Sequence, residues 1–201
     1  TTQSNNTISL NDQAAPIVSS VTSTKTNGSY KQGEVIPITV TFSEVVDVTE
    51  TPTLTLETGE SDAVVNYSFG TGSNTLTFNY TVAAGHNSSN LDYLDTSALV
   101  LNSGTIKDAA TNDATLTLVS PGNANSLGAN KTLVIDTTIP EITLAGIATV
   151  DIEVGSTYTD AGSAATDNYD NDTALSANII TVNNVDTDVV ASYTLTYNVS
   201  D

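Results

Sequence analysis

The sequence predicts an all-β fold of the antiparallel sandwich type, and three features of its 201 residues support this. Short runs rich in β-branched and aromatic residues recur along the whole chain, as expected for half-buried strands. Turn sequences rich in Gly, Asn and Ser separate these runs, for example NGS at 27–29 and GTGSN at 70–74. A helical period of 3.6 residues is sustained nowhere, and LDYLDTSALVL (91–101) is the one ambiguous stretch.

Ten runs are expected to form strands. The first four are VIPITVTF (35–42), TPTLTLE (51–57), AVVNYSF (63–69) and NTLTFNYTV (74–82). The other six are ATLTLVS (114–120), KTLVID (131–136), EITLAG (141–146), TVDIEV (149–154), NIITVN (178–183) and SYTLTYNV (192–199). Many short strands with turns between them favour a sandwich or barrel whose neighbouring strands pair antiparallel.

An internal echo predicts where one domain ends and the next begins. The stretch NTISLNDQAAP (6–16) resembles KTLVIDTTIP (131–140), and in both an Asp precedes a Pro by four residues. Because proline prevents a strand from continuing in the same ladder, each Asp-x-x-x-Pro stretch is interpreted as a short linker. Residues 1–11 are then the tail of a preceding repeat or a linker, and 12–136 form one domain. Residues 137–201 form a second module without its closing strand.

Charge is the most uneven feature of the chain, which carries 23 acidic and 4 basic residues and a net charge of −19. Nucleic acids and anionic membrane surfaces attract clusters of positive charge, so neither is an expected partner. No apolar run approaches the roughly 18 residues needed to cross a bilayer, and no signal peptide opens the sequence. We therefore expect a soluble excerpt of a longer protein, with divalent cations offsetting its negative charge.

The second module resembles a known family. PEITLAGIATVDIEVGSTYTDAGSAATDNYDNDTALSANI (140–179) and VASYTLTYNVSD (190–201) are similar to the immunoglobulin-like (Ig-like) domain that occurs in tandem on bacterial surface proteins. The same domain is appended to some pesticidal crystal proteins. The family's usual Asp-Gly-Asp is Asp170-Asn171-Asp172 here. The resemblance implies an extracellular protein, at the cell surface or secreted.

The first module resembles the repeats of very large, calcium-dependent bacterial surface adhesins. The likeness lies in VTFSEVVDVTETPTLTLETG (40–59), LNSGTIKDAATNDATLTL (101–118) and ANKTLVIDTTIP (129–140). Where that family commonly has Asp-Ala-Ala-Gly-Asn, this chain has DAATN at 108–112. Together the two resemblances imply two tandem Ig-like antiparallel β-sandwiches joined by a short Asp-x-x-x-Pro linker. Neighbouring repeats of the same chain are the implied partners.

The loop ATDNYDND (165–172) is the first candidate site. Calcium takes six to eight oxygen ligands and favours closely spaced acids on loops, which Asp167, Asp170 and Asp172 provide, with Asp160 shortly before them. The loop is not an EF-hand, because it lacks the glycine at the sixth position and the final glutamate of a twelve-residue loop. The alternative is a solvated turn, since Asn and Asp side chains cap their own backbone.

The second candidate site rests on the adhesin resemblance. Asp136 lies in the linker, while Glu44 and Asp108 are expected on loops at the sandwich ends, and comparable acids in the resembled repeats converge on calcium between domains. Asp12 occupies the same place in the first Asp-x-x-x-Pro stretch as Asp136 does in the second. Asp201 lies where the second module's counterpart of the DAATN motif is expected to begin. The alternative is an ordinary acidic linker that keeps the modules soluble. The complete set of predicted metal ligands is Asp12, Glu44, Asp108, Asp136, Asp160, Asp167, Asp170, Asp172 and Asp201, with Ca²⁺ as the expected cofactor.

These features predict a structural and adhesive role, as a calcium-stiffened spacer or stalk segment of a large bacterial surface adhesin. The alternative is a module that binds a surface glycan or a protein ligand through its sandwich-end loops, with Tyr169 as the best-placed aromatic. An enzyme is not expected. The only histidine, His86, lies in a polar turn, and the chain has no cysteine and no Gly-x-Ser-x-Gly motif.

Overall fold

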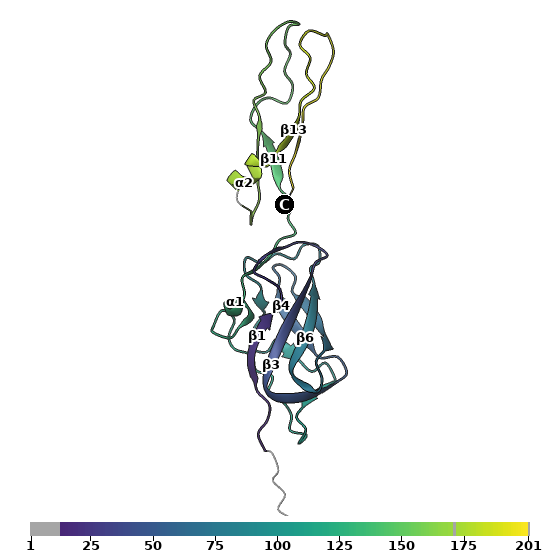
Figure 1. Ribbon diagram of the computed structural model, residues 1–201, viewed down its shortest axis with the longest axis vertical. Helices are drawn as coiled ribbons and strands as arrows, with labels where there is room; N and C mark the ends of the chain where they lie inside the picture. The colour runs from purple at the N-terminus through teal and green to yellow at the C-terminus, as the bar shows by residue number, and fades with distance from the viewer. Residues whose placement is uncertain (1–12, 171, 201) are drawn as a thin grey trace, which may run out of the picture. The chain divides into compact units, whose positions relative to one another are not determined.

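The computed structural model describes residues 13–170 and 172–200. Internal contacts divide the chain into residues 1–137, called unit 1 here, and residues 138–201, called unit 2. The division falls inside the stretch from Asp136 to Pro140. Figure 1 shows that unit 1 consists mainly of strands, whereas unit 2 has short strands joined by long loops; the helices of both units are very short.

Unit 1 contains an eight-stranded antiparallel sheet with the strand order β1-β3-β6-β5-β4-β7, in which β8 also pairs with β4 and β9 with β3. Two further strands, β2 and β10, pair parallel with each other. The strands of unit 1 are β1 (Val18–Ser23), β2 (Gly28–Tyr30), β3 (Val35–Thr49), β4 (Thr53–Glu57), β5 (Ala63–Phe69), β6 (Ser73–Thr81), β7 (Asp92–Tyr93), β8 (Leu99–Val100), β9 (Thr105–Lys107) and β10 (Leu133–Ile135). Its helix is α1 (Leu127–Asn130).

The sheet folds over into two layers between β5 and β6. These strands pair only where Tyr67 lies opposite Phe78 and Phe69 opposite Thr77. β6 pairs with β3 over most of its length, whereas residues 63–66 of β5 pair with β4 and not with β6, so β5 and β6 separate there. One layer therefore holds β1, β3 and β6, and the other holds β4 and β5 with their short neighbours, as in a β-sandwich.

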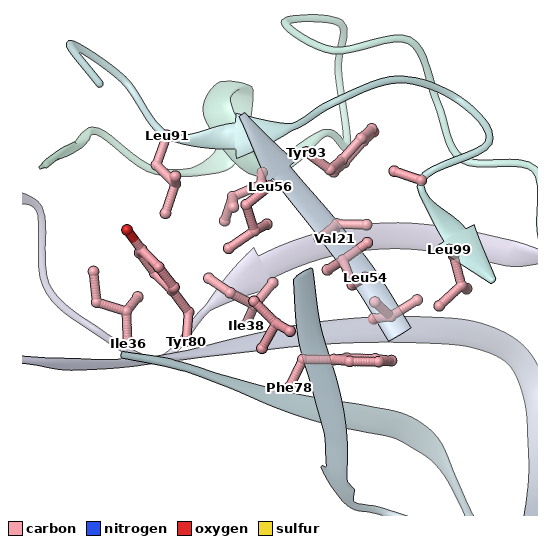
Figure 2. Packing of buried hydrophobic residues seen from close by; sticks show 14 of the residues in the cluster. Val21, Ile36, Ile38, Leu54, Leu56, Phe78, Tyr80, Leu91, Tyr93 and Leu99 are labelled. Atoms are coloured by element: carbon pink, nitrogen blue, oxygen red, sulfur yellow. The ribbon is translucent and has the colours of Figure 1, made fainter. Parts of the chain in front are cut away.

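The core lies between these layers. Alternate residues of β3, β6 and β4 are buried, as strand geometry requires for one inward face. Figure 2 shows Ile38 and Phe78 in one layer pointing toward Leu54 and Leu56 in the other, and all four are fully buried. Burial of such a side chain contributes about 1.5–3 kcal/mol, so this cluster is the main source of stability in unit 1.

Unit 2 is much less packed. It contains β11 (Glu141–Leu144), β12 (Ser163–Thr166), α2 (Asp172–Ala177), β13 (Ile180–Val182) and β14 (Thr196–Asn198). β11 pairs antiparallel with β12, and β13 with β14, as two separate two-stranded sheets. Ala165 and Leu175 are the buried hydrophobic residues among those described in this unit. A cavity of about 670 Å³ in unit 2 is lined partly by apolar side chains, including Ile147 and Ile152.

The all-β prediction is confirmed, with antiparallel sheets throughout except for the β2–β10 pair among the described residues. The run 63–69 coincides with β5. The ambiguous stretch 91–101 forms the two short strands β7 and β8.

Two of the expected strands are wrong. Residues 114–120 form only one isolated bridge, between Thr115 and Ile17, because they make single hydrogen bonds to different partners: Thr115 N donates to Pro16 O, and Leu118 N to Thr96 O. Residues 149–154 form no strand either. Their apolar side chains Val150, Ile152 and Val154 are exposed rather than packed against another layer.

Candidate cation-binding loops

Asp108 lies in the tight loop after β9 and is only 5% exposed. Its Oδ1 accepts a hydrogen bond from Asn112 N at 2.8 Å, and its Oδ2 accepts one from Asn112 Nδ2 at 2.7 Å. Burial pushes the pKa of Asp108 upward, but the donors from the Asn112 side chain and the loop backbone outweigh it and hold the pKa below its ordinary value. The carboxylate is therefore ionised at neutral pH.

The loop takes a left-handed turn without glycine. Thr111 has a φ of 71°, at the position where the resembled repeats carry Gly. Such a conformation costs a non-glycine residue of order 1–3 kcal/mol and persists only where neighbouring contacts stabilise it. Here the hydrogen bonds that link Asp108 and Asn112 supply those contacts.

Glu44 lies within β3 and not on a sandwich-end loop, which corrects the sequence-based expectation. The strand stays extended there because its later residues pair with β6 and β9, although the register shifts between Thr41 and Val46. Ser43 N, next to Glu44, donates to Ile17 O at 2.8 Å.

The Asp108 loop also reaches the segment through which the chain enters unit 1. Asn112 Nδ2 donates to Ala14 O at 3.1 Å, and Ile17 forms an isolated bridge with Thr115. Glu44 and Asp108 therefore both belong to the end of unit 1 where residues 14–17 lie.

Asp136 lies at the opposite end of unit 1. It follows β10, is 6% exposed, and donates its N–H to Tyr30 O at 3.0 Å, shortly before β3 begins. Asp108 instead follows Lys107, which pairs with Asp47 near the end of β3. Fifteen residues of β3 separate these two ends, so Asp136 cannot share a site with Asp108 inside unit 1.

In unit 2, Asp160 is engaged by protein donors. Its Oδ1 accepts hydrogen bonds from the Tyr197 hydroxyl and from Gly162 N. The Tyr197 bond, followed by the Gly162 bond, lowers the pKa of Asp160, and burial opposes this only in part. The same bond raises the pKa of Tyr197 to about 12, with smaller effects from burial and nearby charge. Asp160 therefore ties β14 to the segment before β12.

The loop after β12 is organised by Asp167 and Asp172. Asp167 Oδ1 accepts from Tyr169 N at 2.9 Å, and Asp172 Oδ1 accepts from Asp167 N at 3.1 Å. Asp167 Oδ2 is shielded from solvent and has no hydrogen-bond partner. A buried oxygen of this kind requires an explanation, and an unplaced water or ion is one of those that native proteins provide. Asp170 is half-buried in the same loop.

The described residues contain no group of three acidic or histidine side chains close enough together to hold a metal ion. The structure therefore brings Asp167 and Asp172 together but not the full predicted cage. Asp12, Asn171 and Asp201 lie outside the described residues. Their part in any site stays a prediction.

His86 lies on the loop after β6. Its Nδ1 is 2.9 Å from the Tyr80 hydroxyl and 3.3 Å from Ala83 N. It also lines a polar cleft of about 490 Å³ between the separating strands β5 and β6, together with Asp62, Asn66 and other residues. This cleft could not be predicted from the sequence, because it depends on how β5 and β6 separate.

Comparison with known protein families shows that residues 142–201 match the family described as "Bacterial surface protein, Ig-like domain". The matched residues lie within unit 2. Domains of this family are structural modules of bacterial surface proteins and are not generally enzymatic. No curated protein and no solved structure matches the chain. Among the described residues, no helix is both long and apolar enough to span a membrane.

Proposed function

We propose that the chain is an extracellular repeat segment of a large bacterial surface adhesin, acting as a spacer or stalk that calcium stiffens. The observation that carries the calcium part is the buried, unpartnered Oδ2 of Asp167, in a loop where the Asp167 backbone N–H also binds the carboxylate of Asp172. The match of residues 142–201 to an Ig-like surface domain supports the structural role.

The mechanism follows from charge. The last basic residue of the chain is Lys131, which belongs to unit 1. Unit 2 therefore contains no lysine, arginine or histidine, and its carboxylates have no positively charged side chain within the unit to pair with. Without metal these carboxylates repel one another and the loop after β12 is loosened. Calcium bound by Asp167, Asp172 and backbone oxygens offsets that repulsion and fixes the loop. At the other candidate site, Glu44 and Asp108 supply the carboxylates at the end of unit 1 where residues 14–17 lie.

The expected energies match an extracellular role. Extracellular calcium modules bind with dissociation constants of roughly 10⁻⁴–10⁻³ M, so millimolar calcium outside a cell fills them. A site filled at a hundredfold excess over its dissociation constant stabilises the folded state by about 2.7 kcal/mol. The partners of the segment are the neighbouring repeats, and a surface glycan or protein is a further candidate.

The test is a calcium titration by calorimetry, combined with melting curves in calcium and in chelator. We expect saturable heat and a rise of several degrees in Tm. Asp167→Ala removes the response of unit 2, while Asp151→Ala, which deletes an equal charge at an exposed position of the same unit, retains it. If both variants lose the calcium response equally, or if the native protein shows no heat of binding, the acidic residues serve only to keep the chain solvated. Calcium is then no part of the function.

A further inference from the structure

The loop of residues 83–88 contains the chain's only histidine, and that histidine is fixed by contacts on one edge. The His86 ring stacks on Tyr80, with centroids 5.8 Å apart and planes inclined by 21°. Nδ1 faces two groups: the Tyr80 hydroxyl at 2.9 Å and the Ala83 backbone N–H at 3.3 Å.

These contacts determine which ring nitrogen carries the proton. A backbone N–H can only donate, so Nδ1 must accept from Ala83 and hold a lone pair. Burial raises the pKa of the Tyr80 hydroxyl above its ordinary value, so that group stays protonated and able to donate to the same nitrogen. The native geometry therefore requires the neutral imidazole with its hydrogen on Nε2.

The same loop holds the last segment of unit 1. Gly85 N donates to Thr137 Oγ1 at 3.0 Å, and Thr137 N donates to Asn87 Oδ1 at 2.9 Å. Ser88 and Ile135 exchange two backbone hydrogen bonds, each of 2.8 Å. Four hydrogen bonds between loop 83–88 and residues 135–137 thus depend on the conformation of the loop.

We propose that His86 is an acid-sensitive latch: the neutral imidazole keeps loop 83–88 closed on residues 135–137, and protonation at Nδ1 loosens it. A proton on Nδ1 points at the N–H of Ala83, which cannot become an acceptor. Tyr80 can turn its hydroxyl and accept, so at least one hydrogen bond is lost and one N–H is left facing a positive charge. Imidazole is in general the side chain whose charge can change between pH 5 and 8.

Neighbouring charges give the protonated ring a second position. Asp62, which precedes β5, lines the polar cleft that His86 also lines. Glu57 and Glu60 flank Thr58, whose carbonyl accepts from Asn87 N of the loop. Glu34, whose carbonyl accepts from Val82 N, has its carboxylate 4.0 Å from Lys25 Nζ, and Asp136 lies in the held segment. Because Asp62 is the acid that lines this cleft, its carboxylate attracts the imidazolium toward the cleft and away from its contact with Ala83.

The test uses the whole chain in chelator, so that its outcome does not depend on calcium. Nitrogen NMR of the imidazole at pH 7.5 is expected to show the Nε2–H tautomer. Hydrogen exchange is then compared at pH 7.5 and 5.5. The amides of Gly85 and Thr137 are expected to lose at least tenfold in protection relative to Val40 in β3, after correction for the intrinsic pH dependence of exchange.

The control is His86→Asn, because an amide oxygen can accept from Ala83 but does not titrate in this range. Its protection at Gly85 and Thr137 should not change with pH. An Nδ1–H tautomer in the native protein overturns the proposal without any variant. An equal loss of protection in the native protein and His86→Asn also overturns it, since the loosening would then belong to the carboxylates.

Discussion

At the scale of single residues, Asp108 shows how a carboxylate can be both buried and charged. Two hydrogen bonds from Asn112 hold its oxygens, and its pKa lies below the ordinary value of 3.8. A carboxyl whose pKa is lowered by folding stabilises the folded state above the ordinary pKa. That contribution is lost as the pH falls through the folded-state pKa.

We therefore predict a pH-dependent cost for Asp108→Asn. The difference in Tm between the native protein and the variant should be largest near pH 7 and begin to shrink as the pH falls below about 4, where Asp108 of the unfolded chain takes up its proton. It should disappear only below the lowered folded-state pKa of Asp108, where both side chains are neutral. Circular dichroism melts from pH 7 to pH 3 measure it.

The control for this prediction is Asp113→Asn in the same loop. Asp113 forms an exposed ion pair with Lys107 at 2.6 Å, and such pairs contribute little. Its effect should be small at every pH. A Tm difference for Asp108→Asn that stays constant from pH 7 to pH 3 would show that the loop tolerates either protonation state.

At the scale of elements, the hairpin between β5 and β6 depends on Gly70. Its φ is +124°, and a Cβ there would lie 2.2 Å from the Thr75 carbonyl oxygen. Gly33 also has a positive φ, +89°, but open space surrounds its missing Cβ. Substitution at Gly33 therefore tests backbone strain alone, whereas substitution at Gly70 adds a steric collision to that strain.

We predict that Gly70→Ala destabilises unit 1 by at least about 3 kcal/mol, whereas Gly33→Ala costs about 1 kcal/mol. Urea unfolding with an unchanged m-value measures both. If both substitutions lower the free energy of unfolding equally, the collision with Thr75 does not occur, and only the strain of a positive φ, which both positions share, explains the loss.

Elements could be predicted from sequence where local pattern and pairing agree. AVVNYSF is a strand because Ala63 and Val65 point inward and both β4 and β6 are available as partners. TVDIEV (149–154) has the same alternation but no ladder among the described residues, because pairing depends on another segment being present and in register. Residue pattern specifies which face is apolar, not whether a neighbour meets it.

The candidate site shows the same limit at the scale of the whole molecule. The acidic spacing in DNYDND correctly marked Asp167 and Asp172 as neighbours, since they are close in sequence. The placement of Asp136 and Asp108 at opposite ends of unit 1 could not be predicted, because it follows from the path of β3 and the strands paired with it. The cleft beside His86 likewise depends on the separation of β5 from β6.

The two units also differ in how much apolar surface they bury. The large buried cluster belongs to unit 1, while unit 2 leaves Ile147 76% exposed and Ile152 42% exposed at a cavity of about 670 Å³. Dyes such as 8-anilinonaphthalene sulfonate fluoresce on exposed apolar surface of this kind. Because the surface exists in the folded chain, we predict that the dye binds under native conditions.

Substitution should locate the binding in unit 2. The double variant Ile147→Ser with Ile152→Ser is expected to lower the fluorescence enhancement by at least half, because it removes two apolar walls of the cavity. Val45→Ser, at a valine that is 53% exposed on β3, should leave it unchanged. The main melting transition should stay in place in both variants, since the unit 1 core is untouched. If Val45→Ser lowers the fluorescence as much as the double variant does, the dye binds to scattered apolar residues of the whole surface. The cavity of unit 2 is then no better a binding site for apolar ligands than the rest of the chain.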